Sequence, residues 1–341
     1  MTAFSLPEPV AACCRTLRAA GFAAHPVGGC VRDLLLGRTP GDWDIAASAR
    51  PEQVMALFAR TVPTGVRHGT VTVLLDGAAL EVTTFRREGG YADSRHPGYV
   101  TFDAGLTDDL ARRDFTVNAM ALGAGGEVID PFGGRADLDS RLIRAVGEPE
   151  ERFREDALRI LRGVRFAAQL GFELEGETAA AMEACAPLVN RVSPQRIRVE
   201  VEKVLCSPNP AWIGQLIALG VLDRFYQNWP SGCDYAALAA AEPTPAGRWA
   251  AFCALTGFPI TALPVERALR MAILHPERAA VKGLALTGGE LAGLGFQGAE
   301  IGRIQRLLAG HVLEHPEDNE KARLRQLALR ARGENDTKGE R

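Results

Sequence analysis

Long apolar runs and paired-cysteine motifs are both missing from this sequence. No stretch of 18 apolar residues occurs in the 341-residue chain, so no membrane-spanning helix is expected. The N-terminus lacks the basic segment, apolar segment and small-residue cleavage site of a secreted chain. The seven cysteines include no Cys-x-x-Cys pair, which argues against a disulfide framework and against a zinc site. These absences predict a protein of the cytoplasm.

An excess of charge of one sign is also lacking. The chain has 39 basic and 42 acidic side chains, for a formal net charge of −3, so the total gives no sign of a polyanionic partner. Any nucleic-acid site must therefore be a local patch. Lysine occupies only four positions, so 35 of the basic residues are arginine. A hydrophobic content of 47% predicts a globular protein, and the length predicts two or three modules.

The two halves of the chain differ in their patterns. The first 140 residues mix helical spacing with short β-type runs, whereas helical periodicity dominates from Glu150 onward. Asp76-Gly77 lies between two of these runs and is a strong hairpin signal, so the sheet must contain antiparallel pairing. The fold class predicted is α+β, with an N-terminal mixed or antiparallel sheet followed by an all-α part. The expected strands are 22–27, 43–46, 71–75, 80–85 and 128–129.

A glycine turn follows the first expected strand. Gly28-Gly29 precedes a short helix whose apolar residues share one face and which Gly37 ends. Free backbone N–H groups at a helix start suit a phosphate, and glycine lets the phosphate approach the backbone closely. Arg32, in the first turn, could add positive charge. The alternative is a tight strand–helix turn without a ligand.

Two aspartates follow at alternate positions. Asp42 and Asp44 would project from the same side of a strand. Paired carboxylates repel one another unless a cation lies between them, and Mg²⁺ commonly uses one or two carboxylates together with substrate phosphates. Glu81, on the second strand of the predicted hairpin, could supply a third carboxylate, for instance as a base toward an attacking hydroxyl. The alternatives are a solvated strand edge and an exposed strand glutamate.

Arginines mark two further segments. Arg112 and Arg113 precede Asp114, a predicted N-cap for a helix over 115–122, and Arg113 could bind a triphosphate bidentately. The spacing also predicts one helix over 152–169. On it Asp156, Arg159, Arg162 and Arg165 share one half of the surface. The alternative is a solvated helix face with Glu155–Arg159 and Asp156–Arg159 ion pairs, but three arginines in one lane exceed what those pairs neutralise.

The pairing of aspartate with arginine has a specific chemistry. A carboxylate only accepts hydrogen bonds and a guanidinium only donates them. Cytosine and adenine both present an amine donor beside a ring-nitrogen acceptor on their pairing edge, whereas uracil and guanine present the opposite order. Asp156 together with Arg159 would therefore match C and A and reject U and G.

Taken together, these motifs resemble the class II tRNA nucleotidyltransferases, the bacterial CCA-adding enzymes, which share their core with bacterial poly(A) polymerases. The motifs appear in the family's order over nearly the whole chain, and their combination is specific. The segments that carry the resemblance are 27–38, 41–45, 67–71, 81–85, 112–121, 130–134, 152–166 and 194–203, with a weaker one at 286–298.

The resemblance implies roles for individual residues. Asp42 and Asp44 would hold Mg²⁺, and Glu81 would be the auxiliary carboxylate. Asp156 and Arg159 would read the base. Contacts to the incoming nucleotide would come from Gly29, Arg32, Arg113, Arg162 and Arg165.

The resemblance also implies an architecture and a reaction. It divides the chain into a catalytic head (1–138), a helical neck with the base-reading residues (139–206) and a helical body and tail that bind tRNA (207–341). The enzyme would add C, C and A to the tRNA 3′ end from CTP and ATP, releasing pyrophosphate, without a nucleic-acid template. It would hold the tRNA by the acceptor arm and 3′ end, and neither a membrane nor a stable protein partner is expected.

Three alternatives to full CCA addition stay open. The first two are a CC-only or A-only enzyme and a poly(A) polymerase, and the third is an inactive RNA-binding homologue. Arg67-His68-Gly69-Thr70 is more similar to the CCA-adding form of its segment than to the poly(A) polymerase form. The stretch 86–99 corresponds to a flexible loop that CC-only enzymes lack, which favours addition of the terminal A.

Overall fold

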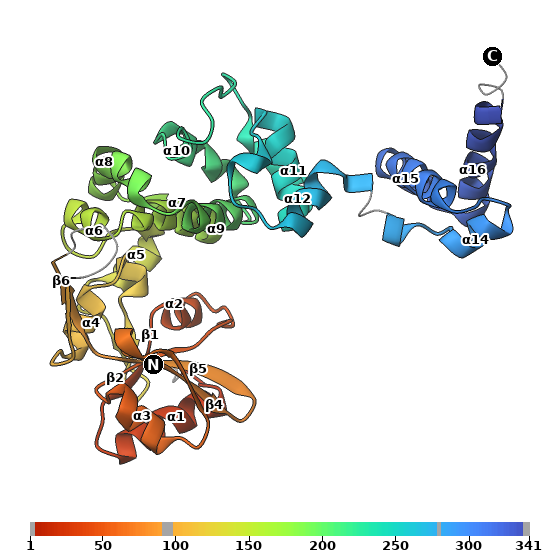
Figure 1. The fold of residues 1–341 in the computed structure, drawn as a ribbon. Coiled ribbons are helices and arrows are strands. Elements are labelled where there is room, and N and C mark those ends of the chain that lie inside the picture. The colour runs from red at the N-terminus through yellow and green to blue at the C-terminus, as the bar shows by residue number, and fades with distance from the viewer. Residues whose placement is uncertain (1–3, 91–97, 278–280, 337–341) are drawn as a thin grey trace. The chain divides into compact units, whose positions relative to one another are not determined.

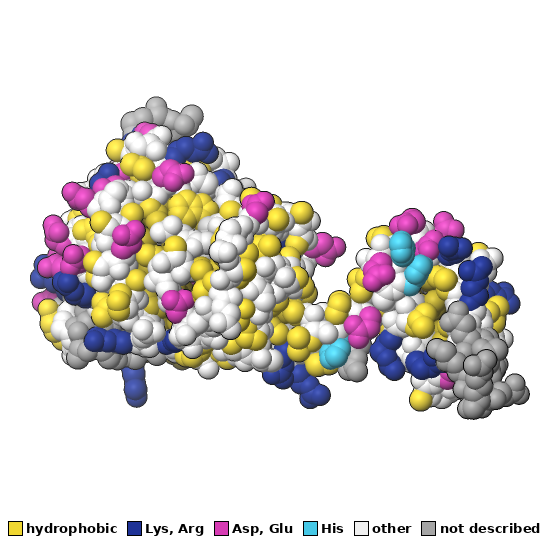
Figure 2. All heavy atoms as spheres, turned by 90° about the horizontal axis from the view of Figure 1, so that it is seen from above, with side chains coloured by type: hydrophobic (Ala, Val, Ile, Leu, Met, Phe, Trp, Pro, Cys, Tyr) yellow, Lys and Arg dark blue, Asp and Glu magenta, His cyan; other side chains and the backbone are white. Residues whose placement is uncertain are grey.

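The computed structural model describes residues 4–90, 98–277 and 281–336. The chain forms two compact units, the first made of Met1–Asn228 with Gly232–Ala240 and the second of Trp229–Ser231 with Ala241–Arg341. No helix in the described ranges is long and apolar enough to cross a membrane. On the face drawn in Figure 2, acidic and basic side chains are both scattered over the surface, in keeping with the small net charge. The finer division into head, neck, body and tail stays a prediction.

A seven-stranded mixed sheet forms the N-terminal part of the first unit, which confirms the predicted fold class (Figure 1). Its order is β3-β4-β5-β2-β1-β8-β9, and every neighbouring pair is antiparallel except β2 and β5. All five strands expected from the sequence are present. The strands are β1 (Ala24–Val27), β2 (Asp44–Ala47), β3 (Thr61–Gly65), β4 (Thr70–Leu75), β5 (Ala78–Thr84), β8 (Ala121–Leu122) and β9 (Val128–Ile129).

The hairpin between β4 and β5 turns at Asp76-Gly77, as predicted. Both residues have positive φ, 47° at Asp76 and 81° at Gly77, which is the conformation of a type I′ turn. This turn fixes the register in which Thr72 lies opposite Glu81 and Val71 opposite Val82. The register places alternate side chains on opposite faces of the sheet.

Apolar side chains of the strands pack on both sides of the sheet. On one side, strand residues such as Ile45, Val73 and Val82 form a core together with α1 (Glu8–Ala19) and α3 (Pro51–Leu57). On the other side, a smaller core includes Ala46 and Leu110, the latter from α4 (Leu106–Ala111). The side chains of Asp44 and Glu81 remain exposed on this second face. Neither the smaller core nor α4 covers this part of the sheet completely.

The expected helix over 115–122 is wrong. The segment forms a 3₁₀ turn, η2 (Thr116–Asn118), and then strand β8. Its side chains from Phe115 to Leu122 are all buried. A short apolar run that is buried on every side cannot be assigned to helix or strand by its periodicity. Asp114 still accepts a hydrogen bond from the N–H of Phe115, at 2.9 Å.

Helices follow the sheet, as predicted. The rest of the first unit contains α5 (Gly134–Ser140), α6 (Pro149–Glu155), α7 (Leu158–Leu170), α8 (Gly176–Cys185), α9 (Pro194–Leu205) and α10 (Ile213–Ala218). Helix α7 packs against α9, and α6 packs against α8. A short parallel pair, β10 (Leu142–Ile143) and β11 (Glu173–Leu174), joins the start of this region to the end of α7.

The second unit is helical in its described part. It comprises α11 (Pro245–Thr256), α12 (Arg267–Leu274), α14 (Gly288–Gly293), α15 (Ala299–Glu314) and α16 (Lys321–Asp336). The α14–α16 helices share a core that includes Leu291, Ile304 and Leu324. The weak motif at 286–298 therefore supplies α14 and part of this core.

The loop that the resemblance places at 86–99 is described only at its two ends. Strands β6 (Arg87–Gly89) and β7 (Tyr99–Thr101) pair antiparallel with each other. Residues 91–97, the middle of the loop, lie outside the described residues.

Candidate active site

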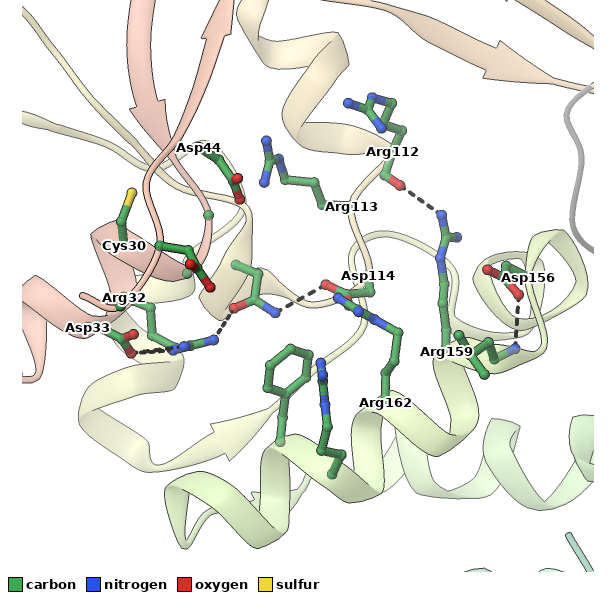
Figure 3. A pocket seen from close by; sticks show the side chains of 18 of the residues that line it. Cys30, Arg32, Asp33, Asp44, Arg112, Arg113, Asp114, Asp156, Arg159 and Arg162 are labelled. Atoms are coloured by element: carbon green, nitrogen blue, oxygen red, sulfur yellow. Dashed lines mark hydrogen bonds and ion pairs between the residues drawn. The ribbon is translucent and has the colours of Figure 1, made fainter. Parts of the chain in front are cut away.

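A cavity of about 570 Å³ lies between the sheet and helix α7 (Figure 3). It is lined by every site residue expected from the sequence except Glu81. Residues as far apart in the chain as Gly28 and Arg196 meet there. The other lining residues are Gly28, Cys30, Asp33, Gly41, Arg112, Asp114, Asn118, Leu158, Phe166 and Arg196.

The glycine turn forms one wall of the cavity. Helix α2 (Gly29–Leu35) begins at Gly29, one residue earlier than the start expected after the Gly28-Gly29 turn. Gly28 has φ 80° and ψ −132°, a conformation that favours glycine. A Cβ atom built on Gly28 would lie 2.7 Å from Nη1 of Arg113. The positive φ therefore favours glycine at 28, and a side chain there would also make the Arg113 guanidinium shift.

The carboxylates lie at the start of strand β2. Asp44 is the first residue of this strand, and Asp42 precedes it by two positions. Because β2 and β5 pair in parallel with Asp44 opposite Glu81, these two side chains lie next to each other on one face. Glu81 therefore borders the cavity from the sheet side, although it does not line it.

The surroundings of Asp44 raise the pKa of its carboxyl. Desolvation by the surrounding protein raises the pKa of this carboxyl above its ordinary value, and the negative charges of Glu81 and Asp42 raise the pKa further. Arg113 acts in the opposite direction, and Figure 3 shows its guanidinium facing the Asp44 carboxylate. A cation placed between the carboxylates would relieve this repulsion.

The donor set fits a hard divalent cation that is completed by its substrate. In the described ranges no group of three His, Cys, Asp or Glu side chains is arranged to hold a metal. Asp42 and Asp44 both line the cavity and offer carboxylate oxygens toward it. Two carboxylates with phosphate oxygens are a common set of ligands for Mg²⁺.

Arg112 and Arg113 are both tied to one buried carboxylate. Oδ1 of Asp109, a fully buried residue, accepts from Nε and Nη2 of Arg112 at 2.9 and 2.7 Å. Oδ2 of Asp109 is 3.4 Å from Nη2 of Arg113. Nε of Arg113 is buried and has no hydrogen-bond partner among the described residues. Arg113 lines the cavity, and its ion pair with Asp109 is long, at 3.4 Å.

A chain of hydrogen bonds joins the glycine turn to helix α7. Arg32 donates to Oδ1 of Asn118 at 2.7 Å, and Nδ2 of Asn118 donates to Oδ1 of Asp114 at 3.2 Å. Oδ2 of Asp114 accepts from Nε of Arg162 at 2.6 Å. Asn118 was not expected from the sequence, and Asp114 was expected only as a helix cap. The spacing of Asp114 and Asn118 four residues apart was the available signal.

Asp114 is strongly ionised despite its burial. Burial alone would raise the pKa of this carboxyl, which is 8% exposed. The positive charge of Arg162 and the hydrogen bond from Asn118 outweigh burial and hold the pKa at about 2, compared with 3.8 ordinarily. The charged form is therefore the one that this part of the cavity stabilises.

This depressed pKa predicts a pH-dependent stability. A carboxyl whose pKa is lower in the folded state contributes stability that is complete above its unfolded pKa and is lost as the pH falls through the folded value. We expect Asp114→Asn to lower the free energy of unfolding by about 2 kcal/mol at pH 7, measured by urea denaturation. The difference from the unaltered protein should shrink as the pH falls from about 4 toward 2. Asp139→Asn, at an exposed site, is the control, and a pH-independent difference would contradict the assignment.

Helix α7 does not begin where the sequence suggested. The expected helix over 152–169 is broken at Asp156, which has φ −143° and ψ 102° and separates α6 from α7. Oδ1 of Asp156 accepts from the N–H of Leu158 at 3.0 Å, as an N-cap side chain does. The break turns Asp156 out of the helical lane and toward the cavity (Figure 3).

The ion pairs around Asp156 also differ from those considered for a solvated helix. The Glu155–Arg159 pair expected for a solvated helix is present, at 2.5 Å. Asp156, however, pairs with Arg196 of α9 at 2.7 Å and not with Arg159. Arg196 was not expected from the sequence, because it lies 40 residues from its partner. Segment 194–203 resembled the family and was the only signal for it.

Arginines converge on one aromatic ring at the base of the cavity. The guanidinium carbons of Arg32, Arg162 and Arg165 lie 5.4, 5.3 and 4.2 Å from the centroid of the Phe166 ring, within cation–π range. Arg165 is buried, and its Nε is 3.2 Å from Oε2 of Glu200. Burial lowers the pKa of Arg165. The positive charge of the lane is therefore partly balanced by Asp114 and Glu200, which come from other elements.

The sequence matches two protein families. Residues 24–144 match the family described as "Poly A polymerase head domain", and residues 171–230 match "Probable RNA and SrmB- binding site of polymerase A". The first match covers the sheet and the glycine turn, and the second covers α8 to α10.

Individual relatives extend this similarity over most of the chain. A CCA-adding enzyme of Geobacillus thermodenitrificans is 41% identical over 335 residues, covering 94% of this chain and 83% of the relative. A CCA-adding enzyme of Geobacillus kaustophilus is 53% identical over 194 residues. That match covers 57% of this chain and spans about half, 48%, of the relative's length.

Solved structures give the same result. The structure of the Bacillus stearothermophilus CCA-adding enzyme in complex with CTP superposes with a TM-score of 0.73 at 35% identity. It covers 95% of this chain, which in turn covers 82% of that one. Because a relative at 41% identity is matched along 83% of its length, the chain belongs to the family of CCA-adding enzymes, template-independent RNA nucleotidyltransferases.

Proposed function

We propose that this protein completes tRNA by adding C, C and A to its 3′ end from CTP and ATP. The observation that carries the proposal is the meeting of two groups in one cavity: the carboxylates Asp42 and Asp44, and the pair Asp156 and Arg159. The first group suits phosphoryl transfer with a metal ion, and the second suits recognition of a base. A cavity of about 570 Å³ is within the range that holds a small-molecule ligand.

In the proposed reaction, the 3′-hydroxyl of the RNA attacks the α-phosphate of the nucleotide. A bond forms between this oxygen and the α-phosphorus, the bond to the β-phosphate oxygen breaks, and pyrophosphate leaves. Glu81, which lies beside Asp44, takes the proton of the hydroxyl. Arg113 and the Gly28-Gly29 turn bind the triphosphate, and Arg32 and Arg162 add positive charge to the same wall.

We further propose Mg²⁺ as the metal ion, held by Asp42 and Asp44. When bound, such an ion lowers the pKa of a coordinated hydroxyl and neutralises charge on the phosphates. The arginines and the glycine turn orient the reacting groups.

Base selection is assigned to Asp156 and Arg159. Asp156 accepts a hydrogen bond from the exocyclic amine of C or A, and Arg159 donates one to the adjacent ring nitrogen. U and G would place an acceptor against the carboxylate and a donor against the guanidinium. Arg165, which is paired with Glu200, is proposed to complete the positive wall next to Phe166. We propose that the helices of 207–341 bind the body of the tRNA, and we place the activity in the cytoplasm.

Sequencing of reaction products tests the function. Purified protein is given tRNA that ends before, within or after CCA, together with CTP, ATP or both. We expect two C residues and then one A on the shortest tRNA, a single A on tRNA ending in CC, and no addition to finished CCA. Addition that stops after CC, addition of A only, or a run of A would instead identify a partial enzyme or a poly(A) polymerase. No addition at all would indicate an inactive RNA-binding homologue.

A further inference from the structure

We infer that Arg196 is a positioning residue that fixes the carboxylate of Asp156 for base selection. The inference rests on the proposed function, because it concerns how the base-reading pair is held. Arg196 lies on α9, lines the cavity, and pairs with Asp156 across the space between α9 and the start of α7.

The contacts to Asp156 leave few ways for its side chain to turn. Arg196 binds both carboxylate oxygens, with Nη1 at 3.3 Å from Oδ1 and Nη2 at 2.7 Å from Oδ2. The N–H of Leu158 also donates to Oδ1. A carboxylate has about four acceptor positions, of which these bonds use three. One position, on Oδ2, is left for a hydrogen bond from a base amine.

Arg159 is held in a comparable way. Nη1 donates to the backbone oxygen of Arg152 at 3.1 Å and to Glu155 at 2.5 Å. Nη2 donates to the backbone oxygen of Arg112 at 2.8 Å. One hydrogen on Nη2 and the hydrogen on Nε have no partner in the described part of the chain. The pair thus presents one acceptor on Asp156 and a small number of donors on Arg159.

Arg196 differs from an ordinary ion-pairing residue on the same helix. Arg198, two positions later, pairs with Glu202 at 2.9 Å within α9 and does not line the cavity. Both arginines are largely buried, with 27% and 15% of their side chains exposed. Only Arg196 joins two elements through a two-point contact, which sets the direction of the partner carboxylate. Arg198 is therefore a matched control for loss of an α9 ion pair.

The expected effect of removing Arg196 is a loss of selectivity. Without it, the Asp156 side chain can rotate, and its free acceptor position no longer faces a fixed point. We expect Arg196→Ala to lower the ratio of C to U incorporation on the order of tenfold, because it disturbs a pair of hydrogen bonds that discriminates between bases. The KM for CTP should change less than this ratio, because the triphosphate contacts are elsewhere.

The test compares Arg196→Ala, Arg196→Lys and Arg198→Ala in single-nucleotide addition of CTP, UTP, ATP and GTP to tRNA lacking CCA. We expect a large loss of selectivity in Arg196→Ala, a partial loss in Arg196→Lys, and none in Arg198→Ala. Unchanged selectivity in both Arg196 variants would overturn the inference. So would an equal loss in Arg198→Ala, or an equal rise of KM for all four nucleotides with selectivity kept. If Arg196→Ala does not fold, the comparison of Arg196→Lys with Arg198→Ala decides.

Failure of this inference can be separated from failure of the proposed function. If the unaltered protein does not prefer C and A, or if Asp156→Ala keeps that preference, the base-reading assignment itself is wrong. A different result would make only the role of Arg196 wrong. In that case the unaltered protein and Arg196→Ala are both selective, whereas Asp156→Ala has lost its selectivity.

Discussion

Asp44→Asn is expected to abolish nucleotide addition while tRNA binding is retained. The substitution keeps the size of the side chain but removes the negative charge that Asp44 contributes, with Asp42, to the proposed metal site. Loss of a metal ligand removes several kcal/mol of transition-state stabilisation, so the rate should fall on the order of 10³-fold or more. Rates are measured by extension of tRNA lacking CCA in the presence of Mg²⁺, and tRNA affinity by a gel-shift titration.

The control for this experiment is Asp76→Asn. It makes the same change on the same sheet, in the β4–β5 turn away from the cavity, where asparagine tolerates the positive φ well. We expect its rate to be unchanged and Asp42→Asn to behave like Asp44→Asn. Nucleotide addition at a near-normal rate by either Asp42→Asn or Asp44→Asn would contradict the assignment of these residues as metal ligands.

Asp156→Ala is expected to remove the preference for C and A. Its carboxylate is the proposed acceptor for the exocyclic amine of these bases, and alanine offers none. The ratio of C to U incorporation should fall on the order of 10- to 100-fold, since a pair of hydrogen bonds to a base discriminates by about 1–3 kcal/mol. The measurement is single-turnover addition of each nucleotide to the same tRNA.

Two further variants sharpen this expectation. Asp156→Asn can donate as well as accept, so it should admit U and G more readily than the unaltered protein does. Glu183→Ala removes an exposed carboxylate on α8 and should leave selectivity unchanged. If Asp156→Ala incorporates the four nucleotides in the original proportions, the carboxylate does not read the base.

Much of the fold followed from short-range signals in the sequence. The Asp76-Gly77 dipeptide was enough to predict the hairpin, and Gly28 and Gly37 marked the two ends of α2. The helix expected over 115–122 was wrong because this segment is buried on all sides, so no polar face marked its secondary structure. The break at Asp156 was not predicted either, and Asp156 pairs there with Arg196 of another helix, a contact that local periodicity does not display.

The sequence identified the residues for which roles are proposed, but it did not show the contacts that hold them in place. Local patterns marked the alternate aspartates, the glycine turn and the arginine lane, and the cavity brings them together. The partners that hold them are Asp109, Asn118, Glu200 and Arg196, and each is an unremarkable residue where it occurs in the sequence. Their importance arises from tertiary packing. A contact such as that between Asp114 and Arg162, 48 residues apart, has no periodicity that a sequence could display.

The most direct test of the account is equilibrium binding of nucleotides to the purified protein without any RNA. The central claim is that side chains of the protein, in place of a nucleic-acid template, distinguish the bases. We expect CTP and ATP to bind on the order of tenfold more tightly than UTP and GTP, and Asp156→Ala to bind all four alike. Equal affinities of the unaltered protein for the four nucleotides would contradict the claim.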